Sequence, residues 1–263
     1  MKLHWMPVHE SDDLKNLSLI SQTADECYYS SILLVYHSLT NDFWIKCANA
    51  INLQHTFKYL LAIRTYAISP EYFVMMYKAF NEIQKNRIMF NIVAGDVQDS
   101  ESCINNLVLY NKDFDTVEKR VNYTYLWMKK MLSLLPTEHV PEIVMSGTSG
   151  QTLLSAALFA DYNLSMLDTY ESDPTKFSCN KNKMVCCAIV IRNTYEEAEH
   201  IVNNIDQPHQ KRWTIFGTEE QIVKKIKELK KIGVTDLMLR SHKNDDQFNL
   251  VHDFVKNHKG VID

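Results

Sequence analysis

Short apolar runs alternate with amphipathic stretches along the whole chain. Most of the runs are unbroken, which is typical of strands that are covered on both faces in a parallel sheet. The stretches between them have the spacing of helices that bury one face. This alternation predicts about eight βα units. The predicted strands are residues 3–6, 31–36, 58–63, 88–93, 142–145, 162–165, 184–191 and 236–239.

Helix start signals support this order of elements. Ser69 stands before a proline and a glutamate, and this arrangement predicts a capped helix over residues 70–84. Thr194 and Thr218 each begin a capping box, in which a hydroxyl and a side chain three residues later satisfy backbone donors reciprocally. Gly233 stands where a left-handed residue would end the helix that follows Thr218. We therefore expect helices between the predicted strands.

The repeated βα units predict an α/β fold, a (β/α)8 TIM barrel. The chain has 263 residues with 46% hydrophobic and 23% charged residues, which is ordinary for a globular protein. No internal repeat or low-complexity linker divides it, so we expect one barrel domain over residues 1–263. Two stretches, residues 97–116 and 167–183, have no clear pattern and are expected to be irregular.

The charge distribution argues against several partners. The formal net charge is −4, and the basic run 224–231 alternates with aliphatic residues as on the solvated face of a helix. We expect no nucleic-acid partner and no membrane partner, because no apolar run approaches a membrane span and the N-terminus has no secretory pattern. The expected location is the cytoplasm. The six cysteines have no metal-ligand spacing, so no metal is expected and buried free thiols are the favoured interpretation.

A hydroxyl-rich turn follows the strand predicted at residues 142–145. Ser146, Gly147, Thr148 and Ser149 precede a helix, where free backbone donors and the positive helix end could bind an anion such as a phosphate. The alternative is an ordinary hydroxyl cap without a ligand, which the residues alone favour.

Three separated segments carry a resemblance to a known family. The first is LAIRTYAISP at 61–70 with NRIMFNIVAGD at 86–96, and the second is PEIVMSGTSG at 141–150. The third is FGTEEQIV at 216–223 with GVTDLML at 233–239. In this order the segments resemble the bacterial-luciferase-like flavin monooxygenases, most closely the alkanesulfonate monooxygenase branch.

The resemblance implies an enzyme that binds FMN as FMNH2, supplied by a separate flavin reductase. With O2 it would oxidise a small organic substrate. The absence of a GxGxxG fingerprint is consistent with a borrowed reductant. The residues implied to hold the cofactor are Asn91, Gly95, Ser146, Gly147, Thr148 and Ser149.

The chain departs from the family pattern at the expected substrate site. Thr40 stands where the alkanesulfonate enzymes have a cysteine, and Cys186 and Ala188 stand where they have an arginine and a histidine. These changes argue against an alkanesulfonate substrate. Arg64 ends a strand and could contact an anionic group or pair with a carboxylate, and His9 matches a histidine that is frequent in the family. Arg64, Thr40 and His9 are the candidate substrate contacts.

Two histidines are the candidate catalytic groups. His242 takes the place of a family tyrosine after the last strand, and His37 follows the second strand. A surface-loop histidine is an equal alternative for His242. Two insertions of the family, including a long loop that closes over the site, are absent or trimmed.

The departures leave other functions open. One is a non-catalytic flavin-binding protein or partner subunit, and another is an F420-dependent oxidoreductase. The resemblance further implies a homodimer or homotetramer, although no sequence feature decides the subunit number.

Overall fold

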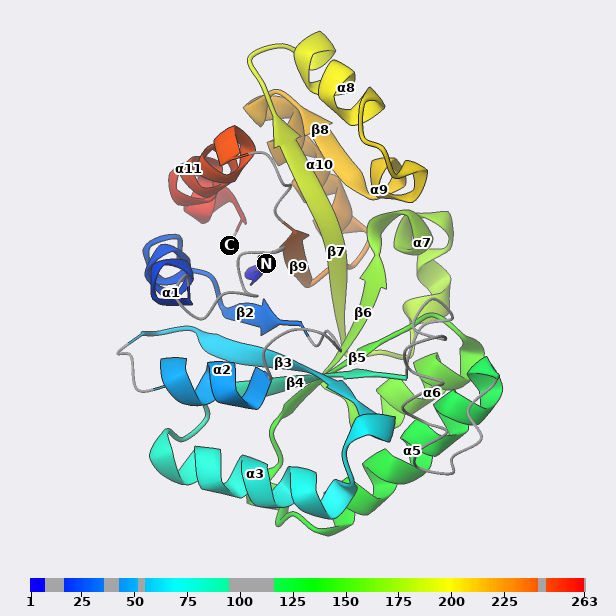
Figure 1. Cartoon of the computed structure of the whole chain (residues 1–263). Coiled ribbons are helices and arrows are strands. Elements are labelled where there is room, and N and C mark those ends of the chain that lie inside the picture. Colours follow the sequence, from blue (N-terminus) through cyan, green and yellow to red (C-terminus); the bar gives the residue numbers. More distant parts are fainter. Residues whose placement is uncertain (8–16, 36–42, 52–54, 95–115, 241–244, 263) are drawn as a thin grey trace.

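The computed structural model describes residues 1–7, 17–35, 43–51, 55–94, 116–240 and 245–262. Eight parallel strands close into a ring in the order β1, β2, β3, β4, β5, β6, β7 and β9 (Figure 1). Closure comes from β9, which pairs with β1 on one side and with β7 on the other. The strands are β1 Lys2–Met6, β2 Ser31–Leu34, β3 Lys58–Arg64, β4 Ile88–Val93, β5 Glu142–Ser146, β6 Tyr162–Met166, β7 Asn182–Ile191 and β9 Asp236–Arg240. The predicted (β/α)8 barrel and its eight strands are confirmed.

Helices surround the ring (Figure 1). They are α1 Leu17–Glu26, α2 Phe43–Ala50, α3 Pro70–Ile83, α5 Val117–Ser133, α6 Gly150–Phe159, α7 Leu167–Ser172, α8 Tyr195–Asn203, α9 Pro208–Arg212, α10 Glu219–Lys231 and α11 Asp245–Ile262. Short 3-10 turns occupy η2 Thr65–Ala67, η4 Thr137–His139 and η5 Pro174–Phe177. Among the described residues, no helix is long and apolar enough to cross a membrane.

The caps read from the sequence are present. Ser69 caps α3, and Thr194 and Thr218 form complete capping boxes at α8 and α10. Gly233 has φ +95°, as expected of a left-handed residue after a helix. These local signals were reliable because each depends only on residues within one helical turn.

Alternation along the strands separates two cores. Inward residues such as Met89, Val144 and Met238 pack together inside the ring. Outward residues pack against the helices: the Phe90 ring lies 4.6 Å from that of Phe73 on α3 and 5.8 Å from that of Trp44 on α2. The barrel interior is therefore filled by side chains, and its two ends are where polar groups can gather.

One strand was not predicted, and two expectations about the chain were wrong. A ninth strand, β8 Thr214–Gly217, pairs with the outer half of β7 beyond the point where β9 leaves it. Residues 167–183 are not irregular, because they contain α7 and η5 and the start of β7. Cys179 is exposed, whereas the described cysteines Cys27, Cys47, Cys186 and Cys187 are buried free thiols as expected.

Candidate active site at the carboxyl ends of the strands

Asn91 and Ser146 meet inside the barrel. Asn91 lies on β4 and Ser146 ends the neighbouring strand β5, where Val93 is its register partner. The Ser146 hydroxyl donates to Asn91 Oδ1 at 2.7 Å. Asn91 is only 4% exposed, and within the described part of the chain its Nδ2 group has no acceptor. Ser146 therefore fixes the amide and leaves its Nδ2 group as a donor that a ligand could use.

The turn after β5 depends on a glycine. Gly147 has φ +136°, and a Cβ there would lie 2.7 Å from Thr152 Cγ2. The turn is also held from β6, where the Asn163 Nδ2 group donates to the carbonyl of Gly147 at 3.2 Å. The Gly147 N–H donates to the Leu164 carbonyl at 3.3 Å. The turn is therefore a fixed part of the barrel rim.

The turn leads into the amino end of α6. The Ser149 hydroxyl accepts from the Thr152 N–H at 3.2 Å and lies 2.7 Å from Thr152 Oγ1. Thr148, Ser149 and Gly150 are exposed, and the first turn of α6 contains no acidic residue. The cap uses the third N–H of the helix, so the earlier donors remain for an anion. Both sequence interpretations, helix cap and anion site, are compatible with this arrangement.

Arg64 lies on the same rim. It is the last residue of β3, on the inward face, and its register partner on β4 is Val93. Two residues earlier on the same strands, Ala62 pairs with Asn91. The side chain is half-buried. Arg64, Asn91 and the Ser146 turn thus occupy three consecutive strands at one end of the barrel.

Cys186 and Ala188 occupy inward positions on β7. Burial raises the pKa of the Cys186 thiol to about 12, and the neighbouring Arg240 only partly opposes this shift. The thiol is therefore protonated near neutral pH and cannot act as a nucleophile or base. The described part of β7 supplies no proton-transfer group to the rim.

Five candidate residues lie outside the described residues. Each belongs to a segment that follows a strand: His9 follows β1, His37 and Thr40 follow β2, Gly95 follows β4, and His242 follows β9. Their roles remain expectations. In the described ranges no three His, Cys, Asp or Glu side chains gather in a way that could hold a metal ion.

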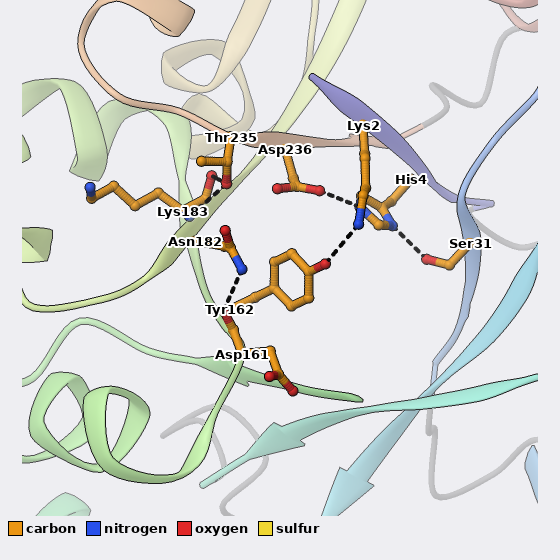
Figure 2. A network of polar contacts seen from close by, with 9 residues as sticks. All are labelled: Lys2, His4, Ser31, Asp161, Tyr162, Asn182, Lys183, Thr235 and Asp236. Carbon is orange, nitrogen blue, oxygen red and sulfur yellow. Dashed lines mark hydrogen bonds and ion pairs between the residues drawn. The ribbon is translucent and has the colours of Figure 1, made fainter. Parts of the chain in front are cut away.

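A buried polar network at the opposite end was missed from the sequence (Figure 2). His4 on β1 contacts the Ser31 hydroxyl through Nδ1 at 2.7 Å and the Asp236 carboxylate through Nε2 at 3.0 Å. Lys2 donates to the Tyr162 hydroxyl at 3.1 Å, and this hydrogen bond raises the pKa of Lys2. The sequence signal that could have indicated this network is the spacing of Lys2 and His4, which places both polar side chains on the same face of β1.

The network has the residue types of a catalytic triad but not the setting of one. Ser31 is 0% exposed and His4 is 1% exposed. Ser31 and Asp236 are the first residues of their strands, so the network lies at the amino ends, where polar clusters in barrels serve stability. We interpret it as a structural tie between β1, β2 and β9.

A closed ring of eight parallel strands with helices outside defines the chain as a (β/α)8 barrel. No protein-family model matches the sequence. Solved structures do match in fold over nearly the full length. A long-chain alkane monooxygenase has a TM-score of 0.79 at 10% identity, over 99% of this chain and 91% of that one. At this identity the likeness shows the shared fold.

Two further solved structures extend the comparison. An EDTA monooxygenase from Chelativorans sp. BNC1 has a TM-score of 0.78 at 12% identity, over 100% of this chain and 95% of that one. An F420-dependent secondary alcohol dehydrogenase, in complex with an F420-acetone adduct, has a TM-score of 0.73 at 12% identity. The match spans 100% of this chain and 99% of the dehydrogenase chain.

Proposed function

We propose that the chain is a flavin-dependent oxidoreductase of the luciferase-like type, and more narrowly an FMNH2-dependent monooxygenase. One observation carries the proposal: the fixed amide of Asn91 and the hydroxyl turn at α6 lie on the same rim of one closed barrel. The fold likeness to two monooxygenases and an F420-dependent dehydrogenase supports it. A separate reductase would supply the reduced flavin.

The described residues suit a phosphorylated flavin. The Asn91 Nδ2 group is a donor without an acceptor in the described ranges, and a flavin carbonyl or ribityl oxygen would accept from it. The N–H groups of Gly150 and Gln151 at the start of α6, with the Thr148 hydroxyl, would bind the phosphate.

When bound, the flavin supplies the electron-transfer chemistry with O2, and the protein supplies position and shielding from water. Ser146 orients the Asn91 amide, and the Ser149 cap keeps the α6 donors aligned. The inward side chains Met6 and Met166 give the rim an apolar lining. His37 and His242 are the proposed groups for proton transfer to or from the substrate.

The second candidate is a flavin-binding protein without turnover. It is favoured by the protonated Cys186 thiol, because the described inward residues of the rim then include no acid or base that titrates near neutral pH. In either case we propose self-association into a dimer or tetramer, which light scattering would test.

A binding experiment with FMN and riboflavin tests the proposal. The full chain is titrated with FMN, FMNH2, riboflavin and F420, and tight binding of FMN over riboflavin is expected because only FMN carries the phosphate. If only F420 binds, the cofactor is F420. If no flavin binds, the proposal is wrong.

A proline substitution tests the position of the phosphate. Gly150→Pro removes one backbone N–H at a helix position that tolerates proline, and Ser149 already has the extended conformation that a following proline needs. We expect FMN to bind about 10-fold more weakly, with riboflavin unchanged. Gly150→Ala keeps the N–H and is the matched control. Equal FMN affinity in both variants would exclude phosphate binding at this turn.

A further inference from the structure

The two ends of the barrel differ in charge. At the amino ends every inward charge has a partner: His4 bonds Asp236, Lys58 lies 2.8 Å from Glu142, and Lys2 bonds the Tyr162 hydroxyl. Most of these residues are the first of their strands. This end is therefore a compensated polar layer.

The carboxyl ends carry positive charge on the inward face of the strands. The last inward residues of the strands, among those described, include two arginines and no aspartate or glutamate. The chain as a whole has a net charge of −4, so positive charge at this rim does not follow from composition. The set is Met6, Arg64, Val93, Ser146, Met166 and Arg240, with Val35 directly after β2 and Ala188 beside Arg240 on β7.

Arg240 is the more informative of the two arginines. It ends β9 next to Ala188 of β7 and shares the inward face with Asp236 and Met238. Its guanidinium carbon lies 5.2 Å from the centre of the Trp213 ring, which is itself only 4% exposed. No hydrogen bond or ion pair joins the guanidinium to a described residue.

The environment of Arg240 favours an anion. Burial lowers the pKa of the guanidinium, and the interior neighbour that opposes the shift is a thiol, Cys186, not a carboxylate. A partly buried cation without a counter-ion among the described residues is costly, and contact with an indole ring leaves guanidinium N–H groups able to bind a carboxylate. Arg240 thus has the position on the rim and the electrostatic environment of an anion-binding group.

We propose that Arg240, supported by Trp213, binds the acidic head group of the substrate, which is a small organic anion with an apolar body. The inference rests on the proposed function, since the flavin would bind next to the substrate at the same end of the barrel. The phosphate site at β5 and Arg240 on β9 are separated by two strands, β6 and β7, so the two anionic groups occupy different sectors of the rim. Met6 and Met166, which are partly buried, provide the apolar contact for the body of the substrate.

Ligand binding to the full chain tests the proposal. Hexanoate is titrated calorimetrically with and without saturating FMN, and hexanesulfonate, hexanol and hexylamine are compared at equal chain length. The variants are Arg240→Met, which keeps the apolar stem, and Arg240→Lys, which keeps the charge. Arg212→Gln is the charge control, because Arg212 is exposed and lies on α9.

We expect hexanoate to bind, hexanesulfonate to bind more weakly, and hexanol and hexylamine not to bind measurably. Arg240→Met should weaken hexanoate binding about 10- to 100-fold, Arg240→Lys less, and Arg212→Gln not at all. Unchanged binding in Arg240→Met, or equal binding of hexanol, would overturn the proposal. Circular dichroism verifies folding, and Arg240→Lys remains informative if the methionine variant does not fold.

Failure of this inference and failure of the proposed function give different results. If Arg240→Met weakens FMN but leaves riboflavin and hexanoate unchanged, Arg240 binds the cofactor phosphate and the substrate assignment is wrong. If no flavin binds while hexanoate binding still depends on Arg240, the anion site stands and the flavin proposal fails.

Discussion

Gly147→Ala should be among the most destabilising single-methyl additions in the described part of the chain. The new Cβ would lie 2.7 Å from Thr152 Cγ2, and alanine is strained at φ +136°. Strain at such a backbone position costs about 1–3 kcal/mol, and the overpacked contact adds about 1–3 kcal/mol. We expect a total loss of about 2–6 kcal/mol in the free energy of unfolding, measured by urea denaturation.

A second substitution separates the two causes. Thr152→Ser removes the Cγ2 methyl group but keeps the hydroxyl that contacts Ser149. Gly147→Ala with Thr152→Ser should therefore recover the contact cost and retain the backbone strain. Gly150→Ala, where nothing lies within 4 Å and φ is not positive, should be neutral or stabilising. Equal stability of the Gly147 and Gly150 variants, or no recovery in the double variant, would refute this reasoning.

Other predictions concern buried titratable groups. Asp236→Ala should lower the free energy of unfolding by about 3–5 kcal/mol, because His4 loses its buried partner. Flavin titration of the folded fraction should show unchanged affinity. Burial lowers the pKa of the His252 imidazole to about 4, below its value in the unfolded chain. The contribution of His252 to the free energy of unfolding is therefore fully present above about pH 6.5 and is lost as the pH falls towards 4. His252→Gln should reduce this acid loss by about 2–3 kcal/mol, and an unchanged pH profile would contradict it. Iodoacetamide with peptide mapping should label exposed Cys179 well before Cys186.

The strands were predictable because burial on both faces makes them continuous apolar runs. β8 escaped prediction because Thr214–Gly217 offers only Ile215 and Phe216 as an apolar core and stands directly before the capping box of α10. α7 escaped for a similar reason: with six residues it is too short to show helical periodicity. What sequence periodicity cannot show is a short element that is stabilised mainly by its neighbours.

The candidate site was predictable in position but not in contacts. That Asn91 and the Ser146 turn share one end follows from parallel strands, since both stand near the carboxyl ends of their strands. The bond between them, across 55 positions of sequence, depends on the register of β4 against β5, which no local pattern encodes. The same holds for Arg240 and Trp213, whose contact requires β9 to end where β8 begins.

The division of polar groups between the two ends has a physical basis. A barrel interior must satisfy every buried charge, and the amino ends do so with neighbouring side chains, such as His4 with Asp236. At the carboxyl ends the Asn91 amide and the Arg240 guanidinium keep donors without described acceptors. Donors that no described residue uses favour ligand binding at this end. Ligand binding at this end should therefore raise the stability of the protein.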